Sequence, residues 1–188
     1  MKMLTAVAAL LLAGTAHAGV INYYTTFEPE GGGGRTGTGS ATASFDDTTN
    51  VFTFSATFSG LSGLTTAAHF HCCTASPFSG IAGVAVDAPT LPIPMGVSAG
   101  SFGAALDLDD ANNFSAGFIT ASGGLNPAIS RFVAGLSSGQ VYLNIHTRPN
   151  FRGGEIRGFM LVPEPATAAL TLVALVALGA VGRRRRGN

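Results

Sequence analysis

Lysine is missing from most of this chain. Lys2 is its only lysine, and the segment between Gly19 and Val162 carries five arginines against nine acidic residues. The formal net charge of zero therefore conceals a mildly acidic middle, because the other arginines are gathered near the C-terminus. Proteins that bind nucleic acid neutralise its phosphates with clustered lysine and arginine side chains. The composition thus indicates that nucleic acid is not a partner.

Long hydrophobic runs are also missing from the middle, and they occur only at the two ends. At the N-terminus, Lys2 precedes an apolar run over residues 4–13 and the small-residue pattern Ala16-His17-Ala18. This order is typical of a signal peptide, and it predicts cleavage by signal peptidase between Ala18 and Gly19. An uncleaved membrane anchor is the alternative, but the run is shorter than the ~20 residues of a spanning helix. We expect residues 1–18 to be a signal peptide and the protein to be exported.

The C-terminus carries a second signal. Pro163, Glu164 and Pro165 are followed by an apolar stretch over residues 166–181 and then by a basic cluster, made of Arg183, Arg184, Arg185 and Arg186. As a helix, the apolar stretch would extend ~24 Å, enough to cross a thin bilayer. The arginines would stay on the cytoplasmic side, which leaves the preceding chain outside the cytoplasm.

This order of motif, hydrophobic helix and arginines resembles the PEP-CTERM sorting signal of Gram-negative bacteria. The resemblance implies recognition by an exosortase in the inner membrane, where the C-terminal helix would hold the protein before processing. The final location would be the periplasm, the cell surface or the extracellular matrix. An ordinary C-terminal membrane anchor is the alternative. We expect residues 163–188 to form the sorting tail.

The middle of the chain has the pattern of short β-strands. From Val51 to Phe58, apolar residues alternate with threonine and serine, so one face of the strand is apolar and the other is hydroxylated. The turn residues from Asp46 to Asn50 predict a β-hairpin over residues 43–58. Further strands are expected at residues 20–27, 66–71, 81–86, 97–106, 114–120, 140–147 and 155–162.

Helical signals are scarce. Asn126-Pro127 begins the one segment with a helix start, which predicts a single short helix on the rim, ending by Gly135. Many short strands between glycine-rich and proline-rich breaks favour an antiparallel sandwich or barrel. We therefore expect residues 19–162 to form one all-β domain, an antiparallel Greek-key-like sandwich or barrel.

Histidine is rare, and its positions suggest a metal site. His69 and His71 are two residues apart on a predicted strand, so their imidazoles project from the same face. In a later predicted strand, Tyr142, Asn144 and His146 also share a face. If the two strands are close, His69, His71 and His146 can converge on zinc or copper. The alternative is that the histidines only form hydrogen bonds with backbone or carboxylate groups.

The chain has two cysteines, and they are adjacent. Cys72 and Cys73 directly follow the His-x-His segment. Three states are open: a strained vicinal disulfide, intermolecular pairing outside the cell, or a thiolate contribution to the metal site. Cys72 is therefore one candidate for a fourth metal ligand, and Glu155 is the other.

A second polar group surrounds the later strand. Glu155 and Arg157 share a face of the last predicted strand, where they can pair with each other or orient His146. With Asn144 they form a predicted polar network, for which a structural role is the commoner use. No Ser-His-Asp or Cys-His arrangement with supporting context is present. We assign no catalytic residue and expect the protein not to be an enzyme.

Three motifs resemble the CHRD domain, a module named after its repeats in chordin. They are Ala68-His69-Phe70-His71, Tyr142-Leu143-Asn144-Ile145-His146-Thr147 and Gly154-Glu155-Ile156-Arg157-Gly158. The resemblance implies an immunoglobulin-like barrel similar to copper/zinc superoxide dismutase, in which a His-x-His strand binds copper. This chain lacks the additional histidines of such a two-metal site, so we do not expect a dismutase reaction.

Three functions follow from these patterns. The first is a binding or structural module of the cell envelope or exopolysaccharide matrix, with exopolysaccharide or surface proteins as partners. The second is a small metalloprotein that holds zinc or copper for redox chemistry or metal scavenging. The third, recognition of protein ligands as in chordin, has no ligand-specific feature in this sequence.

Overall fold

The computed structural model describes residues 19–87 and 91–163. The predicted signal peptide and the predicted C-terminal helix lie outside these residues. Within the described part, no helix has both the length and the apolar character needed to cross a membrane.

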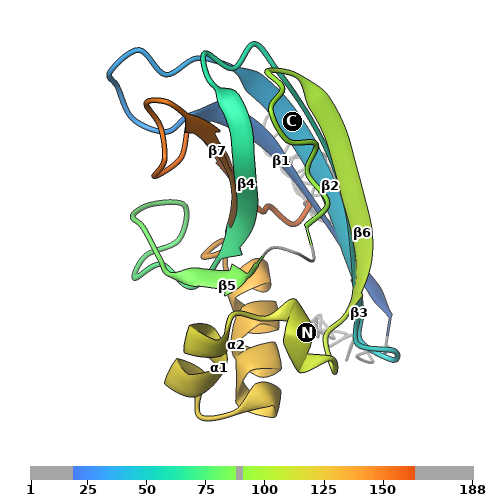
Figure 1. The fold of residues 1–188 in the computed structure, drawn as a ribbon. Coiled ribbons are helices and arrows are strands. Elements are labelled where there is room, and N and C mark those ends of the chain that lie inside the picture. Colours follow the sequence, from blue (N-terminus) through green and yellow to red (C-terminus); the bar gives the residue numbers. More distant parts are fainter. Residues whose placement is uncertain (1–18, 88–90, 164–188) are drawn as a thin grey trace, which may run out of the picture.

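The described chain forms a curled antiparallel sheet with two α-helices at one end (Figure 1). The strand order is β5-β4-β7-β8-β1-β2-β3-β6. In chain order the elements are β1 (Val20–Pro29), β2 (Thr38–Asp46), β3 (Val51–Ser59), β4 (Leu64–His71), β5 (Val84–Val86), β6 (Gly100–Asp107), the 3-10 turn η1 (Ala111–Asn113), α1 (Ala116–Ser122), α2 (Leu125–Ser137), β7 (Tyr142–Arg148) and β8 (Ile156–Phe159). The predicted all-β, antiparallel fold is confirmed.

The predicted hairpin is present as β2 and β3, which pair from Thr38 opposite Ser59 to Asp46 opposite Val51. Its turn forms where Asp46 Oδ1 accepts hydrogen bonds from the amides of Thr48 (2.9 Å) and Thr49 (3.3 Å). The phenylalanines of β3 are buried and the intervening threonines and serines are exposed. The period-two pattern of the sequence therefore identified the buried face.

The strand β1 joins the two halves of the sheet. It pairs with β2 along residues 20–27 and then with β8 through Glu28 and Pro29. Two backbone hydrogen bonds link Thr65 of β4 to Gly96 and Val97, just before β6. The segment ahead of β6 thus lies against the start of β4, and the curled sheet encloses a core rich in aromatic side chains.

The predicted strand over residues 114–120 is wrong, because this segment contains α1. Ser115 caps the helix by accepting a hydrogen bond from the Phe118 amide (3.2 Å), and Gly123 ends it in a left-handed conformation. Phe114 and Phe118 stack with ring centroids 6.0 Å apart. Apolar residues four apart suit one face of a helix as well as one face of a strand, which is why the pattern misled.

The predicted helix near Asn126 is present as α2, but it is not a short piece on the rim. It spans 13 residues, and Phe132 is fully buried. The Phe132 ring meets Phe52 and Phe70 edge-on, with centroids 5.4 Å and 6.3 Å away. The helix thus closes one end of the core.

Candidate metal centre

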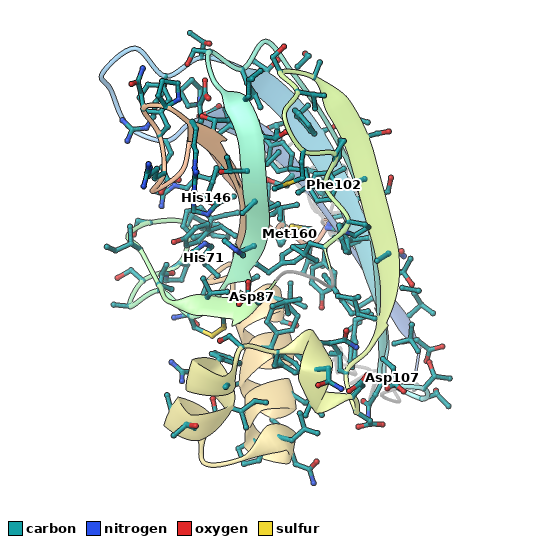
Figure 2. All side chains as sticks on the ribbon, in the orientation of Figure 1. His71, Asp87, Phe102, Asp107, His146 and Met160 are labelled. Atoms are coloured by element: carbon teal, nitrogen blue, oxygen red, sulfur yellow. A yellow bond between two sulfur atoms is a disulfide. The ribbon has the colours of Figure 1, made fainter. Side chains whose placement is uncertain are left out.

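The three histidines lie on the outward face of neighbouring strands. β4 and β7 are antiparallel, with His69 opposite Asn144 and His71 opposite Tyr142. Residues that alternate with them, such as Phe70 and Leu143, point into the core. Figure 2 shows His71 and His146 on the side of β4 that faces away from Met160 and Phe102.

A β-bulge in β4 sets which residues face His146. The register shifts between Thr65, which lies opposite Thr147, and Ala67, which lies opposite His146. A bulge inserts one extra residue into one strand and changes the direction of nearby side chains. As a result the small side chain of Ala67 faces His146, and His69 lies on the diagonal from it.

The imidazoles converge. One nitrogen from each of His69, His71 and His146 lies within 4.8 Å of the other two. His69 Nδ1 is 2.9 Å from His146 Nε2. The ring of His71 stacks on Tyr142, with centroids 4.7 Å apart and planes 2° from parallel. The strand pairing thus brings His146 next to His69, although the two residues are 77 positions apart in the sequence.

The other nitrogen of each ring faces an acceptor. His71 Nδ1 is 2.9 Å from the Ala82 carbonyl oxygen, and His146 Nδ1 is 2.6 Å from the Arg152 carbonyl oxygen. His69 Nε2 is 3.2 Å from Asp87 Oδ1. Carbonyl and carboxylate oxygens only accept hydrogen bonds, so each of these ring nitrogens must carry a proton.

This arrangement leaves three lone pairs together. Where a ring is neutral and its single N–H faces the outer acceptor, the inner nitrogen carries a lone pair. His71 Nε2 is buried and has no hydrogen-bond partner among the described residues. The close pair formed by His69 Nδ1 and His146 Nε2 then requires a shared proton or a cation between the lone pairs.

Burial disfavours protonation of two of the three rings. Desolvation, followed by repulsion from His146, lowers the pKa of His69, and Asp87 offsets part of the shift. Desolvation lowers the pKa of His71 to about 4, although its hydrogen bond to Ala82 opposes the shift. Both rings are therefore neutral near pH 7, which is the form that binds a metal ion.

The two residues expected as a fourth ligand lie elsewhere. Cys72 is joined to Cys73 in a vicinal disulfide, and its sulfur lies near the Arg131 carbonyl oxygen of α2. Of the three open states of the cysteines, the structure thus has the first. Neither Cys72 nor Glu155 belongs to the group of converging nitrogen ligands found in the described residues.

Glu155 is instead a buried structural carboxylate. It accepts hydrogen bonds from the Ser62 amide and hydroxyl (both 2.6 Å) and from the Gly63 amide (3.2 Å). The Thr147 hydroxyl also donates to it. These contacts join the loop before β4 to β7.

The expected pairing of Glu155 with Arg157 is replaced by a network around Glu30. Arg157 Nη1 lies 3.3 Å from Glu30 Oε1, and Asn144 Nδ2 donates to Glu30 Oε2 at 2.6 Å. The guanidinium of Arg157 also lies over the Tyr142 ring, 5.0 Å from its centroid. Sequence reasoning missed Glu30 and Asp87, because neither belongs to the motifs and only the strand order brings them here.

Comparison with known families agrees with the motifs. The family model of the CHRD domain matches residues 25–160. The chain belongs to the CHRD family. The PEP-CTERM protein-sorting motif matches residues 161–186, directly after the CHRD domain. No curated protein and no solved structure matches the chain.

Both resemblances seen in the sequence are thus confirmed. In this CHRD protein the sorting motif implies processing by an exosortase, with export and sorting to the cell envelope or extracellular space of a Gram-negative bacterium. The expected boundaries of the signal peptide, the domain and the tail stay predictions, as does the likeness to superoxide dismutase.

Proposed function

We propose that the CHRD domain is a metal-binding module of the cell envelope or extracellular matrix, in which His69, His71 and His146 hold one zinc or copper ion. The observation that carries the proposal is the convergence of one nitrogen from each ring, together with an acceptor beside the other nitrogen of each ring. Their outer nitrogens face Ala82, Arg152 and Asp87, so three unprotonated nitrogens meet within 4.8 Å. Zinc and copper(II) both accept such imidazole donors.

The outer acceptors suit a preformed site. A metal-bound histidine commonly donates its second N–H to a backbone carbonyl or carboxylate, which holds the ring and raises its basicity. Here two acceptors are backbone carbonyls and the third is Asp87, whose side chain is 43 % exposed. The His69 side chain is 16 % exposed, so the site is open to solvent on the side of His69 and Asp87. An ion can enter there without unfolding the strands.

Metal analysis of the exported protein tests this role. The full chain, purified after export and without chelators, should contain about one zinc or copper ion per molecule by mass spectrometry. Replacing His71 or His146 with alanine should lower the affinity by more than tenfold, because loss of a ligand costs more than the ~10–100-fold of an outer-shell change. The matched control is Asp109→Ala, since Asp109 contacts Asn50 far from the site. Wild-type protein without stoichiometric metal would disprove the role.

A second candidate role is binding to a neutral matrix polysaccharide, and one surface favours it. The outward face of β1, β2, β3 and β6 forms three cross-strand rows without a charged residue. The rows are Asn22-Ser44-Thr53-Ala105, Tyr24-Thr42-Ser55-Gly103 and Thr26-Ser40-Thr57-Ser101. Tyr24 is 45 % exposed in the middle row. Hydroxyl groups and an exposed ring can contact sugar hydroxyls and sugar faces.

Co-sedimentation with insoluble cellulose would test the second role. Thr42→Arg and Ser55→Arg place charge in the middle row and should abolish sedimentation while metal content is retained. Ser130→Arg, on the exposed side of α2, is the control. Equal sedimentation of all four proteins, or none by the wild type, would exclude this surface as a binding site for the polymer.

A further inference from the structure

A second unpartnered atom lies beside the histidines. Asn144 Oδ1 and His71 Nε2 are the buried side-chain polar atoms that have no hydrogen-bond partner in the described chain. Asn144 is 1 % exposed and lies directly opposite His69 across the β4–β7 pair. Facing residues of an antiparallel pair have Cβ atoms about 4.5–5.5 Å apart, so the Asn144 side chain is next to the His69 ring.

The orientation of the Asn144 amide follows from its neighbours. Its Nδ2 donates to Glu30 Oε2 at 2.6 Å and approaches the Gly153 carbonyl oxygen at 3.4 Å. Both neighbours are acceptors, so the NH2 group must face them and the oxygen must point away. A buried amide oxygen without a donor or cation costs about 1–3 kcal/mol, so this orientation needs a compensating contact.

Glu30 is itself held in place. Its Oε1 lies 3.3 Å from Arg157 Nη1, which also donates to the Gly80 carbonyl oxygen at 2.8 Å. Gly154 has a φ of +126°, and a Cβ there would collide with both Glu30 Oε2 and Asn144 Nδ2. The glycine thus leaves the space in which the Glu30–Asn144 hydrogen bond forms.

We propose that the carboxamide oxygen of Asn144 supplies the fourth donor of the metal site and that Glu30 is the positioning residue that directs it. The inference rests on the proposed metal-binding function. Three imidazoles leave one position of a tetrahedral zinc or copper site unfilled. The Asn144 oxygen is a buried acceptor on the same face, whereas the sulfur of Cys72 and the carboxylate of Glu155 are engaged elsewhere. An ion bound by all four donors would give both His71 Nε2 and Asn144 Oδ1 a partner.

The test compares Asn144→Ala and Glu30→Gln with the matched control Glu28→Gln. Glu28 is an exposed acid on β1, opposite Arg157 across the β1–β8 pair, and its variant makes the same chemical change without breaking the Glu30–Asn144 hydrogen bond. Full-length exported protein is titrated with copper(II) and with zinc(II) against a chelator of known affinity. We expect Glu30→Gln to bind about 10–100-fold more weakly than the wild type and the control, as for other residues that orient a metal ligand, and Asn144→Ala, which loses a donor, to bind at least as weakly as Glu30→Gln.

A spectroscopic measurement separates coordination from stability. The electron paramagnetic resonance spectrum of the copper(II) protein should change in Asn144→Ala and Glu30→Gln and stay unchanged in Glu28→Gln. If the wild type binds one ion and both network variants match its affinity and spectrum, the inference is wrong while the metal-binding proposal survives. If the wild type binds no ion, both fail. Should Asn144→Ala not fold, Glu30→Gln decides, because it keeps the size of the side chain at a position that is 16 % exposed.

Discussion

Glu155 is a buried carboxylate whose hydrogen bonds outweigh its desolvation. Burial alone would raise its pKa, but donors from Ser62, Thr147 and Gly63 together hold the pKa below its usual value. Charge-assisted hydrogen bonds are about twice as strong as neutral ones. The residue therefore stabilises the junction between the loop before β4 and the strand β7.

We predict that Glu155→Gln lowers the free energy of unfolding by about 2–4 kcal/mol. A neutral amide accepts these hydrogen bonds less strongly, and its NH2 group would face the donors of Ser62, Gly63 and Thr147 without an acceptor. Urea denaturation at pH 7 measures the loss, with exposed Glu28→Gln as the neutral control. A change below about 0.5 kcal/mol would show that Glu155 does not stabilise the fold.

The same carboxylate predicts a loss of stability in acid. The pKa of Glu155 is lower in the folded state than the ~4.3 of an unfolded glutamate. Its contribution is therefore complete above the unfolded pKa and is lost as the pH falls through the folded value. The difference in stability between wild type and Glu155→Gln should thus narrow as the pH falls below about 4.3. A difference that stays constant from pH 7 to pH 3 would contradict this linkage.

The helix α2 packs closely on the end of β4 through a glycine. At Gly135 a Cβ would lie 2.7 Å from Cys73 Sγ and 2.9 Å from Cys72 Sγ. The cysteines directly follow His71, so the position of α2 and the end of β4 are linked by this contact.

Gly135→Ala should destabilise the protein, although alanine is the better helix former by about 1 kcal/mol. The added methyl group forces α2 or the cysteines to move, which costs about 1–3 kcal/mol as overpacking. Gly117→Ala in α1 is the matched control, because nothing lies within 4 Å of a Cβ there, and it should be neutral or stabilising. Thermal unfolding of both variants checks the pair. A stabilised Gly135→Ala would contradict the packing argument.

The helices also show where local patterns are ambiguous. The apolar spacing around Phe114 and Phe118 suited a strand. The segment is nevertheless the helix α1, which Ser115 caps at its start and Gly123 ends. For α2, the start at Asn126-Pro127 was visible in the sequence. Its burial was not, because the contacts of Phe132 with Phe52 and Phe70 join segments far apart in the chain.

The CHRD domain and the sorting motif occupy separate parts of the chain. The CHRD match ends at residue 160, and the sorting motif covers residues 161–186. We predict that a chain ending at Val162 keeps its fold but changes its cellular fraction, because exosortase processing requires the tail. Fractionation followed by immunoblotting measures this. Finding the truncated and intact proteins in the same fraction would contradict sorting by the tail.

The sequence alone determined the features that depend on local periodicity and on short motifs. The alternation in β3 identified its buried face, the His-x-His spacing placed two imidazoles on one side of a strand, and the motifs identified the family and the sorting signal. Such features need only a period of two or a contiguous run of residues.

Only the tertiary structure decided how the site is assembled. Strand order and the bulge in β4 brought His146 beside His69, and they placed Asp87 and the carbonyl of Ala82 next to the rings and Glu30 next to Asn144. As a result, Glu155 accepts hydrogen bonds from the loop at Ser62, and Arg157 pairs with Glu30 instead of Glu155. The physical reason is that hydrogen-bond partners at long sequence separation depend on which strands are neighbours, and no local pattern encodes that order.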